Sequence, residues 1–106
     1  MNWEIVYTKK ALEELDSIVD YISNALLEPK IAENLFNLIT SEIKGLNQMP
    51  MRNKLWDDEP WRNQGIRVLR VKHYFIFYYP NENEATVYIT RIMYAGRDVS
   101  KQLRKK

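Results

Sequence analysis

The stretch that most constrains the fold is "YFIFYY", residues 74–79, because it is apolar or aromatic at every position. A strand with one face in solvent alternates apolar and polar residues, whereas a strand covered on both faces does not need to. We therefore predict that residues 74–79 form a central strand of a sheet. A plain hairpin loop, "PNENEA", follows and leads into a further predicted strand over residues 86–94.

Two amphipathic helices precede this part of the sheet. Apolar residues recur at helical spacing between positions 11 and 26, and again between positions 31 and 46. Thr8 is placed to cap the first helix, and Pro29 opens the second, where its fixed φ is favourable. Because the break between them, "LLEPK", is short, we expect the helices to pack as an antiparallel hairpin.

The remaining segments complete an α+β domain. We predict a first strand over residues 3–7, and a strand within "GIRVLRV" that a turn at Lys72-His73 joins to the central strand. Asp98 is placed to cap a short last helix. The predicted architecture is therefore an N-terminal strand, then an antiparallel helical hairpin packed on one face of a small, mostly antiparallel sheet, and a short C-terminal tail.

Charge is divided unevenly along the 106 residues, which by length make a single domain, residues 1–106. Residues 1–59 hold 6 Lys/Arg and 11 Asp/Glu, whereas residues 60–106 hold 10 Lys/Arg and 3 Asp/Glu. This asymmetry suggests an anionic partner for the second half, and a solvated surface with a basic tail explains it equally well. The chain has no Cys, no signal-peptide pattern and no apolar run of membrane-spanning length, so we expect a cytoplasmic protein.

Few residues suit metal or cofactor chemistry. The chain contains one His and no Cys, and Asp57, Asp58 and Glu59 form a charge run rather than a spaced ligand set. Its 3 Gly form no phosphate-binding loop. We therefore expect no metal and no cofactor. The candidate functional groups are basic and aromatic side chains on or near the predicted strands: Arg67, Arg70, Lys72, Tyr74, Tyr78, Arg91, Tyr94 and Arg97.

Arg91 lies within the apolar last strand, where a buried cation must be paired. Either an acidic partner lies opposite it or that face of the sheet is open to solvent, and we favour the open face. The sheet would then present a basic concavity, on which guanidinium groups bind phosphate and aromatic rings stack on unpaired bases. His73 or Tyr94 could transfer protons there, although His73 also suits a plain turn and Tyr94 plain packing.

The segment of residues 47–65 shows no periodicity and contains Trp56 and Trp61. A loop of this length in a compact domain usually has a function or a packing of its own. We expect both tryptophans to pin the loop to the body of the domain, with contact to a partner as the alternative.

Three stretches, taken in order, resemble the RelE/ParE superfamily of bacterial toxins from type II toxin–antitoxin modules, which includes plasmid stabilisation proteins. They are "YTKKALEELDSIVDYI", "RVLRVKHYFIFYYP" and "VYITRIMYAGRD", and the resemblance covers nearly the whole chain. The family fold is a small sheet packed on a helical hairpin. The resemblance implies a toxin that a cognate antitoxin holds inactive, and operator DNA that is bound only through the antitoxin.

The resemblance also implies two kinds of target. RelE-type members cleave mRNA on the ribosome without a metal, whereas ParE-type members act on DNA gyrase. Arg67 and Arg70 are the nearest matches to basic residues on the second strand of the RelE-type site, and Arg97 matches the arginine after its last strand. Phe75 stands where that site has an arginine, and Leu103 falls about where it has a tyrosine. The ending "TRIMYAGRDV" looks more like ParE-type relatives.

Three hypotheses follow for the function. The first is a ParE-like inhibitor of DNA gyrase and replication that acts by binding. The second is a RelE-like, ribosome-dependent and metal-independent mRNA endoribonuclease, and only in this case is the chain an enzyme. The third is a non-toxic nucleic-acid-binding or protein-binding domain. The catalytic candidates under the second hypothesis are Arg67, His73, Arg91, Tyr94 and Arg97, and the candidates for binding substrate or antitoxin are Arg70, Lys72, Tyr74, Trp56 and Trp61.

Overall fold

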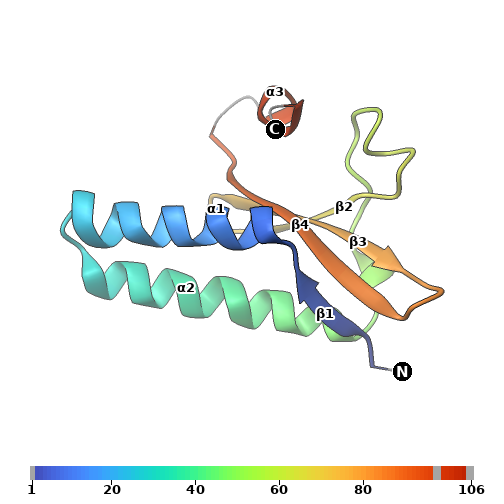
Figure 1. The fold of residues 1–106 in the computed structure, drawn as a ribbon, viewed down its shortest axis with the longest axis horizontal. Coiled ribbons are helices and arrows are strands. Elements are labelled where there is room, and N and C mark those ends of the chain that lie inside the picture. The colour runs from blue at the N-terminus through green and yellow to red at the C-terminus, as the bar shows by residue number, and fades with distance from the viewer. Residues whose placement is uncertain (1, 97–98, 105–106) are drawn as a thin grey trace.

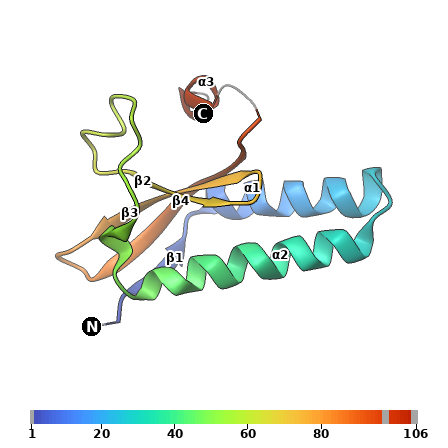
Figure 2. The ribbon, with the colours of Figure 1, turned by 180° about the vertical axis from the view of Figure 1, so that it is seen from behind.

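The computed structural model describes residues 2–96 and 99–104. In chain order the elements are β1 (Glu4–Tyr7), α1 (Lys9–Asp20), α2 (Pro29–Lys44), β2 (Arg67–Val71), β3 (Tyr74–Asn81), β4 (Thr86–Tyr94) and α3 (Val99–Arg104). The predicted α+β class and the predicted order of elements are confirmed. The two long helices lie side by side on one side of the sheet, and α3 lies on the other (Figure 1 and Figure 2). Within the described ranges, no helix has the length and apolar character needed to cross a membrane.

The sheet has the strand order β1-β4-β3-β2. β1 pairs with β4 in parallel, and the other two pairs are antiparallel. β3 lies between two strands, and its residues Ile76 and Phe77, which belong to clusters on opposite faces, are both 0% exposed. The prediction of a central strand covered on both faces is confirmed. The predicted turn at Lys72-His73 is also confirmed, with a φ of 53° at Lys72.

The helical hairpin builds the larger core against one face of the sheet. The Thr8 hydroxyl oxygen accepts the backbone N–H of Ala11 at 3.2 Å, so the predicted cap of α1 is confirmed. α2 begins at Pro29, as predicted. The end of the first helix differs from the prediction, because the chain continues beyond Asp20 as a π-helical turn over Tyr21–Ala25. The buried apolar residues of α1 and α2 in this core are Ala11, Leu15, Leu35, Ile39 and Ile43.

The opposite face of the sheet is covered as well. Phe77 and Met93 are buried there in one cluster with Val99 of α3. The ring of Trp56 packs edge-on against Phe75 and Phe77, with centroid distances of 5.6 and 5.1 Å. The prediction that Trp56 pins its loop is confirmed. The prediction of an uncovered basic face is wrong, because this loop and α3 add a second apolar layer to the sheet.

Candidate functional site

Arg91 has an acidic partner, Glu14 on α1. The Nε atom of Arg91 lies 3.0 and 3.1 Å from the two carboxylate oxygens of Glu14, and its Nη2 atom lies 2.9 Å from Oε2. The two side chains are only 16% and 17% exposed, so the pair is largely withdrawn from water. Of the two explanations for a cation in this strand, the paired acid is therefore right and the open face is wrong.

A β-bulge lies directly beside Arg91. The register between β3 and β4 steps from Phe77↔Arg91 to Tyr78↔Ile89, which leaves Thr90 without an opposite residue. A bulge bends its strand and changes the direction of the neighbouring side chains. With Thr90 as the extra residue, Ile89 and Ile92 both belong to the inner cluster although they are three positions apart, and Arg91 pairs with Phe77 of the outer cluster.

Glu14 also closes an open strand edge. β1 pairs with β4 only as far as Ile89, and beyond that point the described residues offer β4 no further strand on this side. The hydroxyl of Thr8 donates to the carbonyl of Ile89 at 2.8 Å, and Glu14 Oε1 accepts the backbone N–H of Ile92 at 2.9 Å. Glu14 thus binds a backbone N–H of β4 that a neighbouring strand would otherwise bind.

Arg67 on β2 holds the preceding loop. Its Nη1 atom donates to the backbone carbonyls of Asn53 at 2.7 Å and Met51 at 3.3 Å. The hydroxyl of Tyr78 on the adjacent strand donates to the carbonyl of Pro50 at 2.7 Å. Burial raises the pKa of Tyr78, so this hydroxyl keeps its proton at neutral pH. The guanidinium of Arg67 is therefore engaged in fixing the loop.

The turn between β2 and β3 exposes further basic side chains. Nε of Arg70 donates to the carbonyl of Lys72 at 2.9 Å, and its guanidinium carbon lies 5.6 Å from the centre of the Phe75 ring. His73 has an exposed side chain, and its carbonyl accepts the N–H of Ala95 at 2.7 Å. His73 thus lies in the turn, and its backbone carbonyl links the turn to the residue after β4.

Tyr74 and Tyr94 face each other at the end of the sheet. Their ring centroids are 5.8 Å apart with an interplanar angle of 64°. Burial, and secondarily the neighbouring Tyr94, raises the pKa of Tyr74, so its phenol stays neutral at physiological pH. Arg97, which was predicted to follow this strand end as a functional cation, and Asp98, which was predicted to cap α3, lie outside the described residues.

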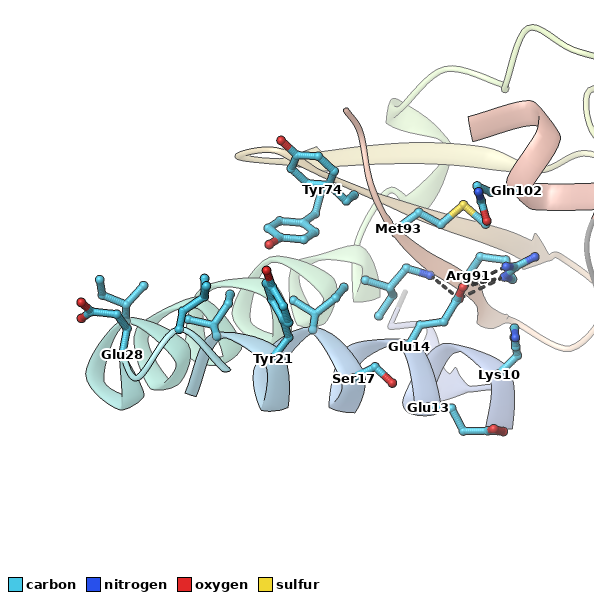
Figure 3. Close-up of a pocket in the computed structure, with 16 residues that line it drawn as sticks. Lys10, Glu13, Glu14, Ser17, Tyr21, Glu28, Tyr74, Arg91, Met93 and Gln102 are labelled. Atoms are coloured by element: carbon cyan, nitrogen blue, oxygen red, sulfur yellow. Dashed lines mark hydrogen bonds and ion pairs between the residues drawn. The ribbon is translucent and has the colours of Figure 1, made fainter. Parts of the chain in front are cut away.

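A groove of about 830 Å³ separates α1 and the tip of the helical hairpin from the end of β3 and β4 (Figure 3). It brings together three of the predicted site residues, Tyr74, Arg91 and Tyr94. Arg67 and His73 are not part of its lining. The helical side and the hairpin tip contribute Ile18, Tyr21, Ile22, Leu26 and Ile31.

Glu14 and Tyr21 are among the groove residues that sequence reasoning did not propose for a site. Glu14 belongs to a run of acidic residues that the helical pattern places on the solvent face, and Tyr21 lies outside the apolar stripe of α1. The signal that could have found Glu14 was Arg91, since a cation within an apolar strand requires an acid nearby.

Trp61 is half-buried and lies close to the C-terminal helix. The guanidinium carbon of Arg104 lies 5.4 Å from the centre of the Trp61 ring. The hydroxyl of Ser100 donates to the carboxylate of Asp58, which makes a second link between α3 and the loop. Leu103 packs against the outer cluster of the sheet. The loop and α3 therefore cover this face together, and Trp61 contacts α3.

Comparison with known families agrees with this architecture. The family model for the ParE toxin of the type II toxin–antitoxin system parDE matches residues 5–99. The chain belongs to this ParE toxin family. No curated protein matches it significantly.

Solved structures show the same fold for this ParE-family chain. It is similar to the chromosomal ParDE system from P. aeruginosa, with a TM-score of 0.70 and 23% identity over 87% of this chain and 95% of that one. A chain of the RelBE2 toxin–antitoxin complex from Mycobacterium tuberculosis gives a TM-score of 0.62 and 20% identity over 89% and 92%. A mutant E. coli RelE toxin in the free state gives a TM-score of 0.64 and 13% identity over 95% of this chain and 90% of that one.

Proposed function

We propose that this chain is the toxin of a type II toxin–antitoxin module, that a cognate antitoxin neutralises it, and that it inhibits DNA gyrase in the manner of ParE-type toxins. The match of the ParE toxin family to residues 5–99 carries this proposal. Similar chains occur in a ParDE system and in a RelBE2 toxin–antitoxin complex, which supports an antitoxin partner. The antitoxin would carry any contact with operator DNA, and the protein would act in the cytoplasm.

The engagement of the sheet cations supports a toxin that acts by binding. Metal-independent RNA cleavage requires cations that are directed at the phosphate in the transition state, together with groups that transfer protons. Arg91 forks onto Glu14, and Arg67 donates to two loop carbonyls. A phosphate could recruit either guanidinium only by breaking contacts that hold the fold together. These contacts argue against Arg67 and Arg91 as the phosphate-binding cations of the expected ribonuclease site.

A ribosome-dependent mRNA endoribonuclease is the second candidate. The observation in its favour is the ring contact between Tyr74, which directly follows the exposed turn with Lys72 and His73, and Tyr94 at the end of β4. Aromatic rings beside basic side chains suit stacking on unpaired bases. In this case Tyr94, which is 49% exposed, would be accessible to RNA.

Induced expression of the chain in a bacterial host without its antitoxin tests the proposal. We expect growth arrest, loss of negative supercoiling of a reporter plasmid and intact mRNA, and we expect antitoxin co-expression to restore growth. The purified chain should also inhibit supercoiling by gyrase in vitro. Codon-linked mRNA breaks with unchanged supercoiling would establish the endoribonuclease instead. Normal growth despite accumulation of folded protein would contradict both toxic functions.

A further inference from the structure

The layer that covers the outer face of the sheet is basic. It consists of residues 54–65 and α3, which lie on the side of the sheet opposite the helical hairpin (Figure 1 and Figure 2). Together with Arg70 and Lys72 of the adjoining strand and turn, we call it the outer layer. The outer layer holds six Lys/Arg and three Asp/Glu, whereas the helical layer, residues 9–44, holds four and seven. The charge of the domain is therefore divided between its two sides.

The acidic side chains of the outer layer already have partners within it. Asp57 pairs with Lys54 and Arg62, at nitrogen–oxygen distances of 3.7 and 4.0 Å. Asp58 accepts a hydrogen bond from α3, and Glu59 accepts one from the backbone of the loop. The excess of positive charge in the outer layer therefore lies on β2, on the turn that follows it and on α3.

Two exposed arginines of the outer layer are held over aromatic rings. The guanidinium carbon of Arg70 lies 5.6 Å from the centre of the Phe75 ring, and that of Arg104 lies 5.4 Å from the centre of the Trp61 ring. Nε of Arg70 also donates to the carbonyl of Lys72, while its terminal nitrogens make no hydrogen bond within the described part of the chain. A guanidinium that is held over a ring keeps its N–H groups for a second partner and loses little freedom on binding. Both arginines are therefore prearranged for an anionic oxygen.

The aromatic rings of the outer layer and of the strand beneath it are already in use. Trp56 packs on Phe75 and Phe77, and the two guanidinium groups lie over Phe75 and Trp61. Single-stranded nucleic acids are bound largely by stacking of their bases on free rings, whereas duplex DNA is bound through its phosphates at any sequence. The fork of N–H donors on arginine matches phosphate oxygens. The outer layer therefore fits the phosphates of a duplex better than unpaired bases.

We propose that the outer layer binds the phosphate backbone of duplex DNA, without preference for base sequence, through Arg70, Lys72 and Arg104. Lys101 lies one turn before Arg104 on α3 and adds a cation, and the sequence continues with two more Lys, which lie outside the described residues. This contact differs from recognition of the operator, which the antitoxin carries in the proposed function. It also goes beyond that function, because a gyrase inhibitor that acts by binding the enzyme needs no contact with DNA.

Fluorescence anisotropy of the full chain with a short labelled duplex DNA, in the absence of antitoxin and gyrase, tests the proposal. We expect two duplexes of unrelated sequence to bind alike. Contact with about four phosphates should make the logarithm of the binding constant fall with the logarithm of the salt concentration, with a slope of about −3 to −4. A labelled single-stranded RNA of the same length should bind more weakly than the duplex.

Variants locate the contact on the outer layer. Arg70→Gln and Arg104→Gln should each weaken duplex binding about 5- to 10-fold at about 0.1 M salt and make the slope shallower by about 1. Arg70→Lys keeps the charge and should keep the slope. Lys44→Gln removes the same charge from an exposed position of α2, on the opposite side of the sheet, and should leave affinity and slope nearly unchanged. All of these side chains are exposed, so the variants should stay folded, which circular dichroism verifies.

Three results would overturn the inference. One is the absence of duplex binding at low salt, and another is tighter binding of the RNA than of the duplex, which would favour the ribosome-dependent candidate. The third is an equal loss of affinity in Lys44→Gln and Arg70→Gln, which would show that net charge rather than the outer layer attracts the DNA. The assay contains no gyrase, so none of these results bears on gyrase inhibition. A chain that binds duplex DNA but does not inhibit gyrase would contradict the proposed function alone.

Discussion

The carboxylate of Glu14 binds both the guanidinium of Arg91 and the backbone N–H of Ile92, and so joins α1 to β4 at the point where β1 ends. Sheets leave unpaired backbone groups at their edges, and proteins usually cover or charge such edges. In this chain a helix side chain covers part of the edge. The same contact forms part of the wall of the groove (Figure 3), so the stability of the fold and the shape of the groove depend on one residue.

Glu14→Ala is expected to lower the free energy of unfolding by about 2–4 kcal/mol, because it leaves a mostly buried cation unpaired and a strand N–H unsatisfied. Glu14→Gln should cost less, since its amide oxygen can still accept the N–H of Ile92. Urea unfolding followed by circular dichroism measures both. Glu13→Ala, at an exposed position on the same helix, is the matched control and should change stability by less than about 0.5 kcal/mol.

The double variant Glu14→Met/Arg91→Met separates the charge from the packing. Removal of both partners takes away the unpaired charge, so the pair of substitutions should cost less than the sum of the single ones. Simple additivity of the two losses would show that the ion pair contributes nothing, and would contradict the role given to Glu14.

Alkaline pH should destabilise the fold through Tyr78. Burial raises the pKa of Tyr78 above its ordinary value, so the unfolded chain loses this proton at a lower pH than the folded chain does. The contribution is fully present below about pH 10, the ordinary tyrosine pKa, and is lost as the pH rises from there toward the folded pKa. Unfolding in urea at several pH values should show a steeper alkaline loss of stability in the wild type than in Tyr78→Phe.

The comparison with Tyr78→Phe isolates this residue. Burial also raises the pKa of Tyr7 and Tyr74, and both tyrosines are present in the two proteins, so their effects cancel in the difference. At neutral pH the variant should lose about 0.5–1.5 kcal/mol, because the hydrogen bond to the carbonyl of Pro50 is gone. Parallel pH profiles for the two proteins would exclude Tyr78 as the titrating group.

Local sequence patterns predicted the elements of the fold well. The unbroken apolar run at residues 74–79 gives the central strand, and Thr8 and Pro29 mark the helix starts, because strand burial and helix caps depend on neighbouring residues. The π-helical turn at Tyr21–Ala25 was missed. A single π-helical turn is too short to change the spacing of apolar residues in the sequence, so the pattern looks the same as that of an α-helix near its end.

The candidate site was harder to predict, because its contacts join distant parts of the chain. Arg91 was correctly singled out as a cation that needs an explanation, but its partner lies on the first helix, and only the tertiary structure shows this. The outer face was expected to be open, yet Trp56 and Val99 cover it from an aperiodic loop and a short terminal helix. Neither segment carries a pattern that reveals which face of the sheet it covers.

Arg67→Ala and Arg70→Ala should differ in stability although both arginines belong to β2. Arg67 holds the carbonyls of Met51 and Asn53, and loss of these hydrogen bonds from a charged donor should cost about 1–3 kcal/mol. Arg70 is exposed, and its removal should cost less than about 0.5 kcal/mol. Urea unfolding and limited proteolysis of the loop measure the difference. Equal stability of both variants would show that the Arg67 guanidinium is not needed by the loop and is available to a ligand.

Trp56→Ala and Trp61→Ala test how the long loop is held on the outer face of the sheet. Trp56 packs edge-on against two rings of β3, Phe75 and Phe77, so its truncation should lower stability by about 2–4 kcal/mol, near the lower end for a large aromatic residue. Trp61 is half-buried and stacks with Arg104, so its truncation should cost about 1 kcal/mol or less. Denaturant unfolding gives both values, and binding of a hydrophobic dye reports exposure of Phe77. If Trp61→Ala proved the more damaging variant, α3 rather than the sheet would be the main anchor of the loop.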